Sequence, residues 1–116
     1  MKTKNVLIVC DSENQCYWNT WIDNIKERLK SVRIDIDISG RENNNVFDMI
    51  MVDKSNLEEL RHLIPKIRHK HSQSRILVVS STPTWKQTRE VIRLGAANLI
   101  RKSSNLEEII KEFELL

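Results

Sequence analysis

The chain has 116 residues, with only two glycines and two prolines, 40% hydrophobic residues and 30% charged residues. This length predicts a single domain spanning residues 1–116, large enough to bury a core without metal or disulfide cross-links. Gly40 and Gly95 stand far apart, which excludes the glycine-rich loops that bind dinucleotides or nucleoside triphosphates. The shortage of turn-forming residues also argues against a sandwich or barrel built from tight hairpins.

The net charge of +3 is too small to indicate direct nucleic-acid binding. Residues 61–75 hold five basic residues, three histidines and no acid, which we interpret as a solvated helix face, with an anion-binding patch as the alternative. Cys10 and Cys16 are too few for a disulfide framework, and the apolar run at residues 6–10 is too short for a signal peptide or a membrane span. We therefore expect a cytoplasmic protein with reduced cysteines and no membrane contact.

Continuous apolar runs alternate with helical stripes along the chain, and this pattern predicts a parallel sheet covered by helices. Strands are expected at residues 6–10, 32–38, 46–52, 76–79 and 97–101. Helices are expected at residues 14–30, 57–67, 84–94 and 106–113.

The predicted strand at 32–38 alternates apolar and polar residues strictly, which places it at the edge of the sheet with one wet face. Only about seven residues, 39–45, separate it from the next strand, whereas a parallel crossover needs a dozen or more. We therefore expect the helix between the second and third strands to be shortened or absent.

Local signals mark the helix ends. Ser55 with Glu58, and Ser104 with Glu107, have the spacing of capping boxes and predict two helix starts. Gly95 is well placed to end the helix at 84–94.

Pro65 interrupts the apolar stripe of the helix predicted from residue 57. Proline lacks a backbone N–H and fits the first turn of a helix. We expect it to kink this helix or to begin a second one.

Polar residues follow four of the predicted strands, namely Asp11, Asp53, Ser80 and Lys102. Ligands of open parallel sheets bind outside the carboxyl ends of the strands. Two carboxylates suit a hard cation such as Mg²⁺, while a lysine and a hydroxyl can bind phosphoryl oxygens. A carboxylate in such a site can also act as the nucleophile.

At these residues the sequence resembles the response-regulator receiver domain, and the resemblance covers essentially the whole chain. VLIVCDSE resembles the family's first strand with its acidic pair, and FDMIMVD its third strand, with Asp53 at the phosphoacceptor position. ILVVSS resembles the fourth strand with Ser80, and LGAANLIRK the segment leading to the family's lysine, here Lys102. The resemblance implies a CheY-like, flavodoxin-like α/β fold, with a five-stranded parallel sheet in the order 2-1-3-4-5 and helices on both faces.

The resemblance also implies a signalling domain of a bacterial two-component or phosphorelay pathway, not a metabolic enzyme. A histidine kinase or phosphotransfer protein would donate a phosphoryl group to Asp53, with Mg²⁺ held by Asp11, Asp53 and the backbone carbonyl of Ser55. Ser80 and Lys102 would bind the acyl phosphate. The family's fourth helix, fifth strand and fifth helix would then present the change to a downstream effector protein or domain, or to a second copy in a homodimer.

Several residues depart from the family pattern. Cys10 replaces the first acid of the pair, and a thiol is a poor ligand for Mg²⁺, so the cation should bind more weakly, with Glu13 as a candidate substitute. Leu99 stands where an aromatic residue usually reports phosphorylation, and Ser103 replaces the proline after the lysine. These departures favour an alternative function, a phosphorylation-independent pseudo-receiver that acts as a protein–protein or dimerisation module.

Other residues have simpler interpretations. Cys10 is expected to be a buried small hydrophobe rather than a redox sensor, and the three histidines to be solvated rather than metal ligands. Trp18 and Trp21 share one helical stripe and are expected in the core. Trp85 begins a helix and is a candidate anchor for a protein partner.

Overall fold

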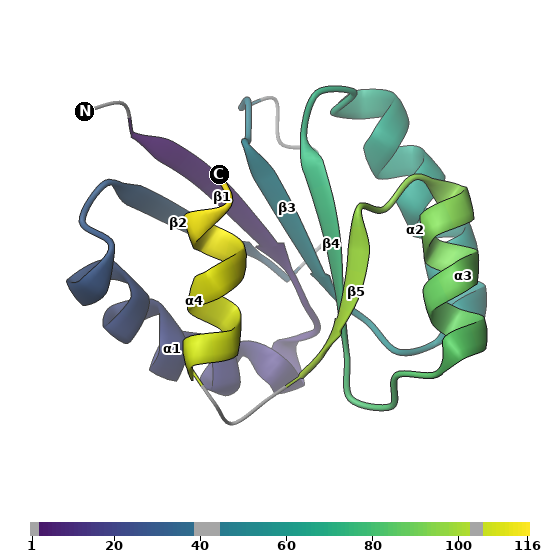
Figure 1. The fold of residues 1–116 in the computed structure, drawn as a ribbon, viewed down its shortest axis with the longest axis horizontal. Helices are drawn as coiled ribbons and strands as arrows, with labels where there is room; N and C mark the ends of the chain where they lie inside the picture. The colour runs from purple at the N-terminus through teal and green to yellow at the C-terminus, as the bar shows by residue number, and fades with distance from the viewer. Residues whose placement is uncertain (1–2, 39–44, 103–105) are drawn as a thin grey trace.

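The computed structural model describes residues 3–38, 45–102 and 106–116, the side chain of Leu106 excepted. One parallel sheet has the strand order β2-β1-β3-β4-β5, which confirms the predicted fold class (Figure 1). The strands are β1 (Lys4–Val9), β2 (Val32–Asp37), β3 (Met49–Asp53), β4 (Arg75–Ser80) and β5 (Asn98–Arg101). A 3-10 turn, η1 (Ser12–Asn14), precedes the helices α1 (Gln15–Arg28), α2 (Leu57–Lys70), α3 (Trp85–Leu94) and α4 (Leu106–Glu114). None of the helices in the described residues is long and apolar enough to cross a membrane.

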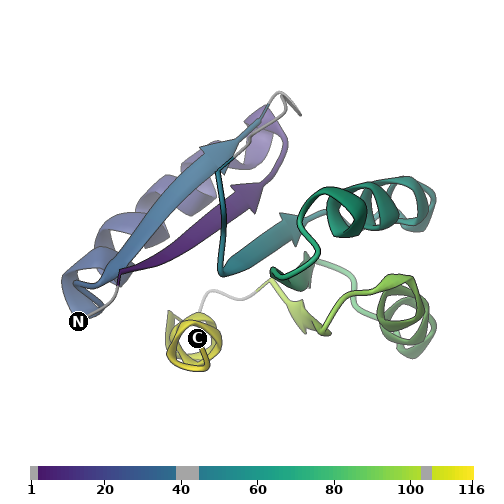
Figure 2. The ribbon, with the colours of Figure 1, turned by 90° about the horizontal axis from the view of Figure 1, so that it is seen from above.

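The sheet separates two apolar layers, with α1 and α4 on one face and α2 and α3 on the other (Figure 2). Strand β3 serves both layers, because Met49 and Met51 pack toward α1 and α4 while Ile50 and Val52 pack toward α2 and α3. All four side chains are fully buried, as expected for a central strand of a doubly wound sheet. Trp18 lies in the first layer with no exposed surface, which confirms its predicted place in the core.

Strand β2 lies at the edge of the sheet, as predicted. Ile34 and Ile36 pack toward α1, so the alternation of the strand turns Arg33, Asp35 and Asp37 toward the opposite face. This face offers no apolar surface that a crossover helix could cover. The described residues between β2 and β3 contain no helix, in agreement with the prediction, and residues 39–44 of this connection lie outside the described residues.

The N-terminus of α2 differs from the predicted capping box of Ser55 and Glu58. Asn56 is the N-cap, and its side chain accepts a hydrogen bond from the backbone N–H of Glu59 at 3.1 Å. Asparagine is as favourable an N-cap as serine, and the shift by one residue leaves Ser55 free for contacts with the loop after β4. The second predicted capping box cannot be compared, because Ser104 lies outside the described residues.

Helix α2 runs through Pro65 without interruption, so the prediction that a second helix begins there is wrong. Leu60 and Ile64 are fully buried on the inner side of this helix, while Pro65 is exposed on its outer side. Burial of these two side chains contributes about 3–6 kcal/mol, which offsets the roughly 3 kcal/mol cost of proline within a helix.

Gly95 ends α3 with a φ of 118°, which confirms its predicted role. The guanidinium of Arg68, near the end of α2, donates to the carbonyl oxygen of Gly95 at 2.9 Å and to those of Ser72 and Ser74 at 3.0 and 2.8 Å. Arg68 therefore ties the end of α2 to the end of α3.

We expect Gly95→Ala to lower the free energy of unfolding by about 1–2 kcal/mol, because a side chain at this positive φ is strained. The added Cβ would also lie 3.4 Å from Nε of Arg68. Urea denaturation of the variant and the wild type measures the difference. Arg93→Ala, on the exposed side of α3, is the control and should change stability by less than about 0.5 kcal/mol. Equal stability of the Gly95→Ala variant and the wild type would contradict the prediction.

Candidate functional site

The parallel strands bring the predicted site residues to one edge of the sheet. Asp53 and Ser80 are the last residues of β3 and β4, and Lys102 directly follows β5. The Asp53 side chain is 5% exposed, and its Oδ2 lies 2.9 Å from Nζ of Lys102. The structure therefore joins Asp53 and Lys102 in a buried ion pair at the position where this type of sheet binds ligands.

Trp18 is a member of the site that sequence reasoning placed only in the core. Its indole Nε1–H donates a hydrogen bond of 2.7 Å to Oδ2 of Asp53, the same oxygen that faces Lys102. Lys102 in turn donates to Oδ1 of Asn14 at 2.8 Å and lies 4.4 Å from the ring centroid of Tyr17. The Asp53 carboxylate thus has a matched cation and a donated hydrogen bond within the protein, as a buried charge requires.

Lys54, the residue after Asp53, is a second member that the sequence did not single out. Its ammonium forms an ion pair with Oδ1 of Asp11 and lies 3.5 Å from Oε2 of Glu59. Burial disfavours the charged ammonium, but the hydrogen bond and the charge of Asp11, joined by those of Glu59, outweigh burial and raise the pKa of Lys54. Lys54 is therefore held as a cation beside Asp11.

Ser80 belongs to a separate group of polar contacts. Its Oγ lies 3.3 Å from Oγ of Ser55 and 3.4 Å from Oε1 of Gln87, and it accepts a hydrogen bond from the backbone N–H of Thr82. Within the described residues no hydrogen bond joins Ser80 to Asp53. The backbone carbonyl of Ser55 accepts a hydrogen bond of 2.8 Å from Nε2 of Gln87.

Cys10 occupies the first position of the acidic pair and is 1% exposed. Burial raises the pKa of its thiol, and the negative charges of Asp53 and Asp11 raise it further. The thiol is protonated at neutral pH and packs in the apolar layer of α1 and α4, in agreement with its interpretation as a small hydrophobe.

The predicted Mg²⁺ ligands already have other partners. Asp11 is paired with Lys54, Asp53 with Lys102, and the carbonyl of Ser55 with Gln87. In the part of the chain that the structure describes, no group of three or more His, Cys, Asp or Glu side chains is placed to hold a metal ion. In this arrangement Asp11, Asp53 and the carbonyl of Ser55 would each have to leave or share a present partner before they could bind an Mg²⁺ ion.

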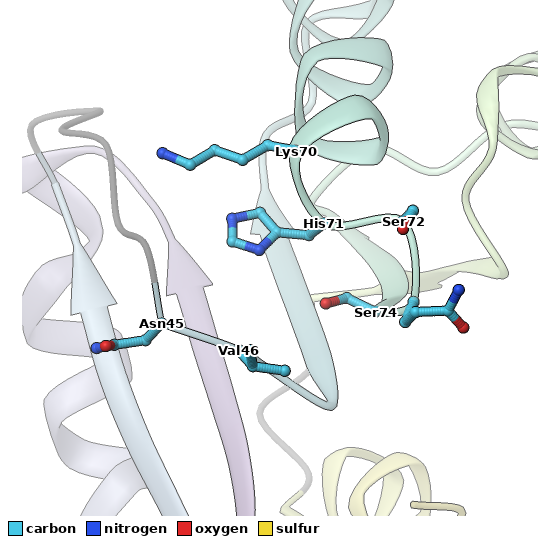
Figure 3. Close-up of a pocket in the computed structure, with 7 residues that line it drawn as sticks. Asn45, Val46, Lys70, His71, Ser72 and Ser74 are labelled. Carbon is cyan, nitrogen blue, oxygen red and sulfur yellow. The ribbon is translucent and has the colours of Figure 1, made fainter.

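Most of the basic side chains of the segment 61–75 are solvated, as predicted, since Arg61, Lys66 and Lys70 are exposed on α2. The other two have specific partners. Arg75 forms an ion pair with Glu112 of α4 at 2.9 Å, and the guanidinium of Arg68 donates hydrogen bonds to backbone carbonyls. Lys70 and His71, at the C-terminal end of α2, line a cavity of about 270 Å³. Figure 3 shows their side chains beside it. Burial, followed by the charge of Lys70, lowers the pKa of His71, so this imidazole is neutral at physiological pH.

Two further residues that the sequence singled out can be placed. Trp85 is 76% exposed at the start of α3, consistent with the prediction that it is available to a partner. Leu99 lies in β5, and its side chain is buried in the layer of α2 and α3. A leucine therefore fills the position at which the receiver family usually has an aromatic residue. Ser103, the other departure after Lys102, lies outside the described residues.

No protein-family model matches the sequence, and no curated protein sequence is significantly similar to it. A response regulator from Thermotoga maritima matches with a TM-score of 0.80 and 19% identity, over 97% of this chain and 96% of the other. HP1043, an orphan response regulator of H. pylori, matches with a TM-score of 0.78 and 18% identity, over 99% and 98%.

A third similar structure is a response regulator from Burkholderia pseudomallei with a phosphorylated aspartic acid, a calcium ion and citrate. It matches with a TM-score of 0.69 and 22% identity, over 97% of this chain and 71% of the other. The chain therefore has the CheY-like fold of response-regulator receiver domains, as its sequence motifs predicted.

We expect Lys54→Met to increase the affinity for Mg²⁺ at least about tenfold, because it removes the cation that now neutralises Asp11 and Glu59. Isothermal titration calorimetry should detect binding to this variant and little or none to the wild type. Lys86→Met on α3 is the control, and the double variant Lys54→Met, Asp11→Asn should lose the gain. Equal Mg²⁺ affinity of the wild type and Lys54→Met would show that Lys54 does not compete with the ion for Asp11.

The two free cysteines should differ in reactivity, because Cys16 is exposed and Cys10 is buried. A thiol reagent is expected to label native Cys10 at least about a hundredfold more slowly than Cys16 at pH 8. Its raised pKa shifts any labelling of Cys10 to higher pH. Mass spectrometry of Cys16→Ser and Cys10→Ser variants, native and in urea, separates the two sites. Similar native rates for both would refute the buried, protonated state of Cys10.

Proposed function

We propose that this chain is a signal-transduction module that works through protein–protein contacts and does not depend on phosphoryl transfer, the pseudo-receiver function. The observation that carries this proposal is that the ammonium of Lys54 is paired with Asp11, the acid expected to hold a metal ion beside Asp53. Phosphorylation signals by changing the local charge of a bistable element. At this edge Asp11 and Asp53 already have lysine partners. The ammonium of Lys54 occupies the place beside Asp11 where a metal cation would have to bind.

The geometry around Asp53 supports the same conclusion. The carboxylate is 5% exposed, and its Oδ2 is held by Trp18 and Lys102 together. A nucleophile must approach its target in line and within about 3.5 Å. These two contacts fix the orientation of the Asp53 carboxylate, and its low exposure limits the approach of a phosphodonor.

The outer side of α3 supplies a surface for a protein partner. Trp85 and Ile92 are 76% and 49% exposed, and their spacing places them with Arg89 on one side of the helix. Exposed tryptophan beside arginine is the composition of interaction hot spots. A downstream effector or a second copy of the chain would bind here. The proposal places the protein in the bacterial cytoplasm, without membrane or direct nucleic-acid binding.

A second candidate function is phosphorylation of Asp53 by a histidine kinase or phosphotransfer protein. The 2.9 Å contact of Asp53 with Lys102, together with Ser80 at the end of the neighbouring strand, favours it. A carboxylate oxygen of Asp53 would attack phosphorus while the phosphorus–nitrogen bond of the donor's phosphohistidine breaks. Lys102 and Ser80 would bind the transferred phosphoryl oxygens.

The two functions differ in one measurement. We expect that incubation with acetyl phosphate and Mg²⁺ leaves the intact mass of the wild type unchanged, while a conventional receiver labelled in parallel gains one phosphoryl group. Sedimentation velocity should show the same association state with and without the phosphodonor. A phosphoryl adduct on the wild type that is missing from Asp53→Asn would overturn the proposal in favour of the second candidate.

A further inference from the structure

A groove of about 500 Å³ lies between the carboxyl ends of β1 and β2 and the helix α2. Its lining includes the apolar side chains of Val9, Ile38 and Leu63, called here the floor, and the basic side chains of Lys54, His62 and Lys66, called the rim. We call it the α2 groove. It borders the Asp53 edge, since Lys54 directly follows Asp53 in the chain.

We propose that the α2 groove binds a small organic anion with an apolar body, of the kind represented by a medium-chain carboxylate. The volume falls in the range of small-molecule sites, which are mostly apolar with a few polar groups that fix the orientation of the ligand. Ile38 is 38% exposed, so the floor still has apolar surface for a ligand to cover.

The charges of the rim select an anion. Lys66 and His62 are exposed and have no ion pair within the described part of the chain. Glu59, the one carboxylate in the lining, lies 3.5 Å from Nζ of Lys54, a cation that it shares with Asp11. A carboxylate headgroup above the apolar floor would meet Lys66, which would bind it by a charge-assisted hydrogen bond, and the imidazole of His62, which can donate a hydrogen bond.

The size of the groove and its surroundings favour a small molecule over a docked helix. The side of β2 that faces away from α1 carries Arg33, Asp35 and Asp37, so the apolar surface stops at the floor of the α2 groove. An amphipathic helix needs a longer apolar stripe than this floor provides.

Lys54 connects the α2 groove to the Asp53 edge, because its side chain contacts both. Its ammonium lines the α2 groove and at the same time pairs with Asp11. An anionic headgroup that reaches Lys54 competes with Asp11 for the same cation, so ligand binding would alter the charges beside Asp53. The α2 groove would then receive a chemical signal whether or not Asp53 accepts a phosphoryl group.

The test uses the full chain labelled with ¹⁵N, and two probes with the same apolar tail, sodium octanoate and octanol. Octanoate is expected to give saturable shifts of the amide resonances of Val9, Ile38 and Leu63, and to bind about tenfold more tightly than octanol. Equal affinity of the two probes would overturn the anion site, and shifts that are unsaturable or located elsewhere would overturn the groove itself.

Variants check the assignment to the rim. Lys66→Gln should weaken octanoate about threefold, the effect of one exposed charge, and should leave octanol unchanged. Lys86→Gln on the exposed side of α3 is the matched control and should bind octanoate as the wild type does. If the two variants lose affinity equally, the rim does not select the anion and the proposal fails. The intact-mass experiment on Asp53 has no bearing on this outcome.

Discussion

The pairing of Asp53 with Lys102 is the interaction around which this edge of the molecule is organised. Strand β3 is fully buried in both layers of the protein, and it ends with a carboxylate that is only 5% exposed. A buried charge without a partner costs several kcal/mol, so a cation and donor groups must be close by. Lys102 arrives from β5 and Trp18 from α1, which fixes the relative positions of three elements that are far apart in the sequence.

A second pair extends this arrangement toward β1. Lys54 joins Asp11, at the end of β1, to Glu59 in the first turn of α2. Lys102 pairs with Asp53, and Lys54 is shared by Asp11 and Glu59. Gln87 donates a hydrogen bond to the carbonyl of Ser55 in the adjoining loop. Because these contacts come from different elements, a molecule that displaced one of them would remove a link between two parts of the fold. The proposed function, a module that changes its contacts with other proteins, would use such links.

The large elements could be predicted from the sequence because their signals are local. The continuous apolar runs located the buried strands, and the strict alternation of 32–38 located the edge strand and its wet face. The approach of Asp53 to Lys102 followed from the parallel direction of the strands alone. The N-cap of α2 was misplaced by one residue, since Ser55 and Asn56 both satisfy the local rule and only the tertiary contacts of Ser55 decide between them.

The partners of the acids were not predictable in the same way. Lys54 stands next to Asp53 in the sequence, but nothing in that position shows that its side chain turns toward Asp11. Trp18 has the spacing of a core residue, and it is one, yet its indole N–H also reaches a carboxylate 35 positions away in the chain. Such contacts depend on side-chain direction after the sheet has formed, which hydrophobic periodicity does not encode.

Arg68 has a consequence for the way the molecule opens. Its guanidinium binds carbonyl oxygens in the loop after α2 and the carbonyl of Gly95 at the end of α3. If either helix detached alone, this guanidinium or those carbonyls would lose their partners, at a cost of about 1–3 kcal/mol for each unsatisfied group. The two helices should therefore protect their amides from hydrogen exchange as one cooperative unit. Local opening on this face of the sheet would then release the outer surface of α3 and the wall of the α2 groove together.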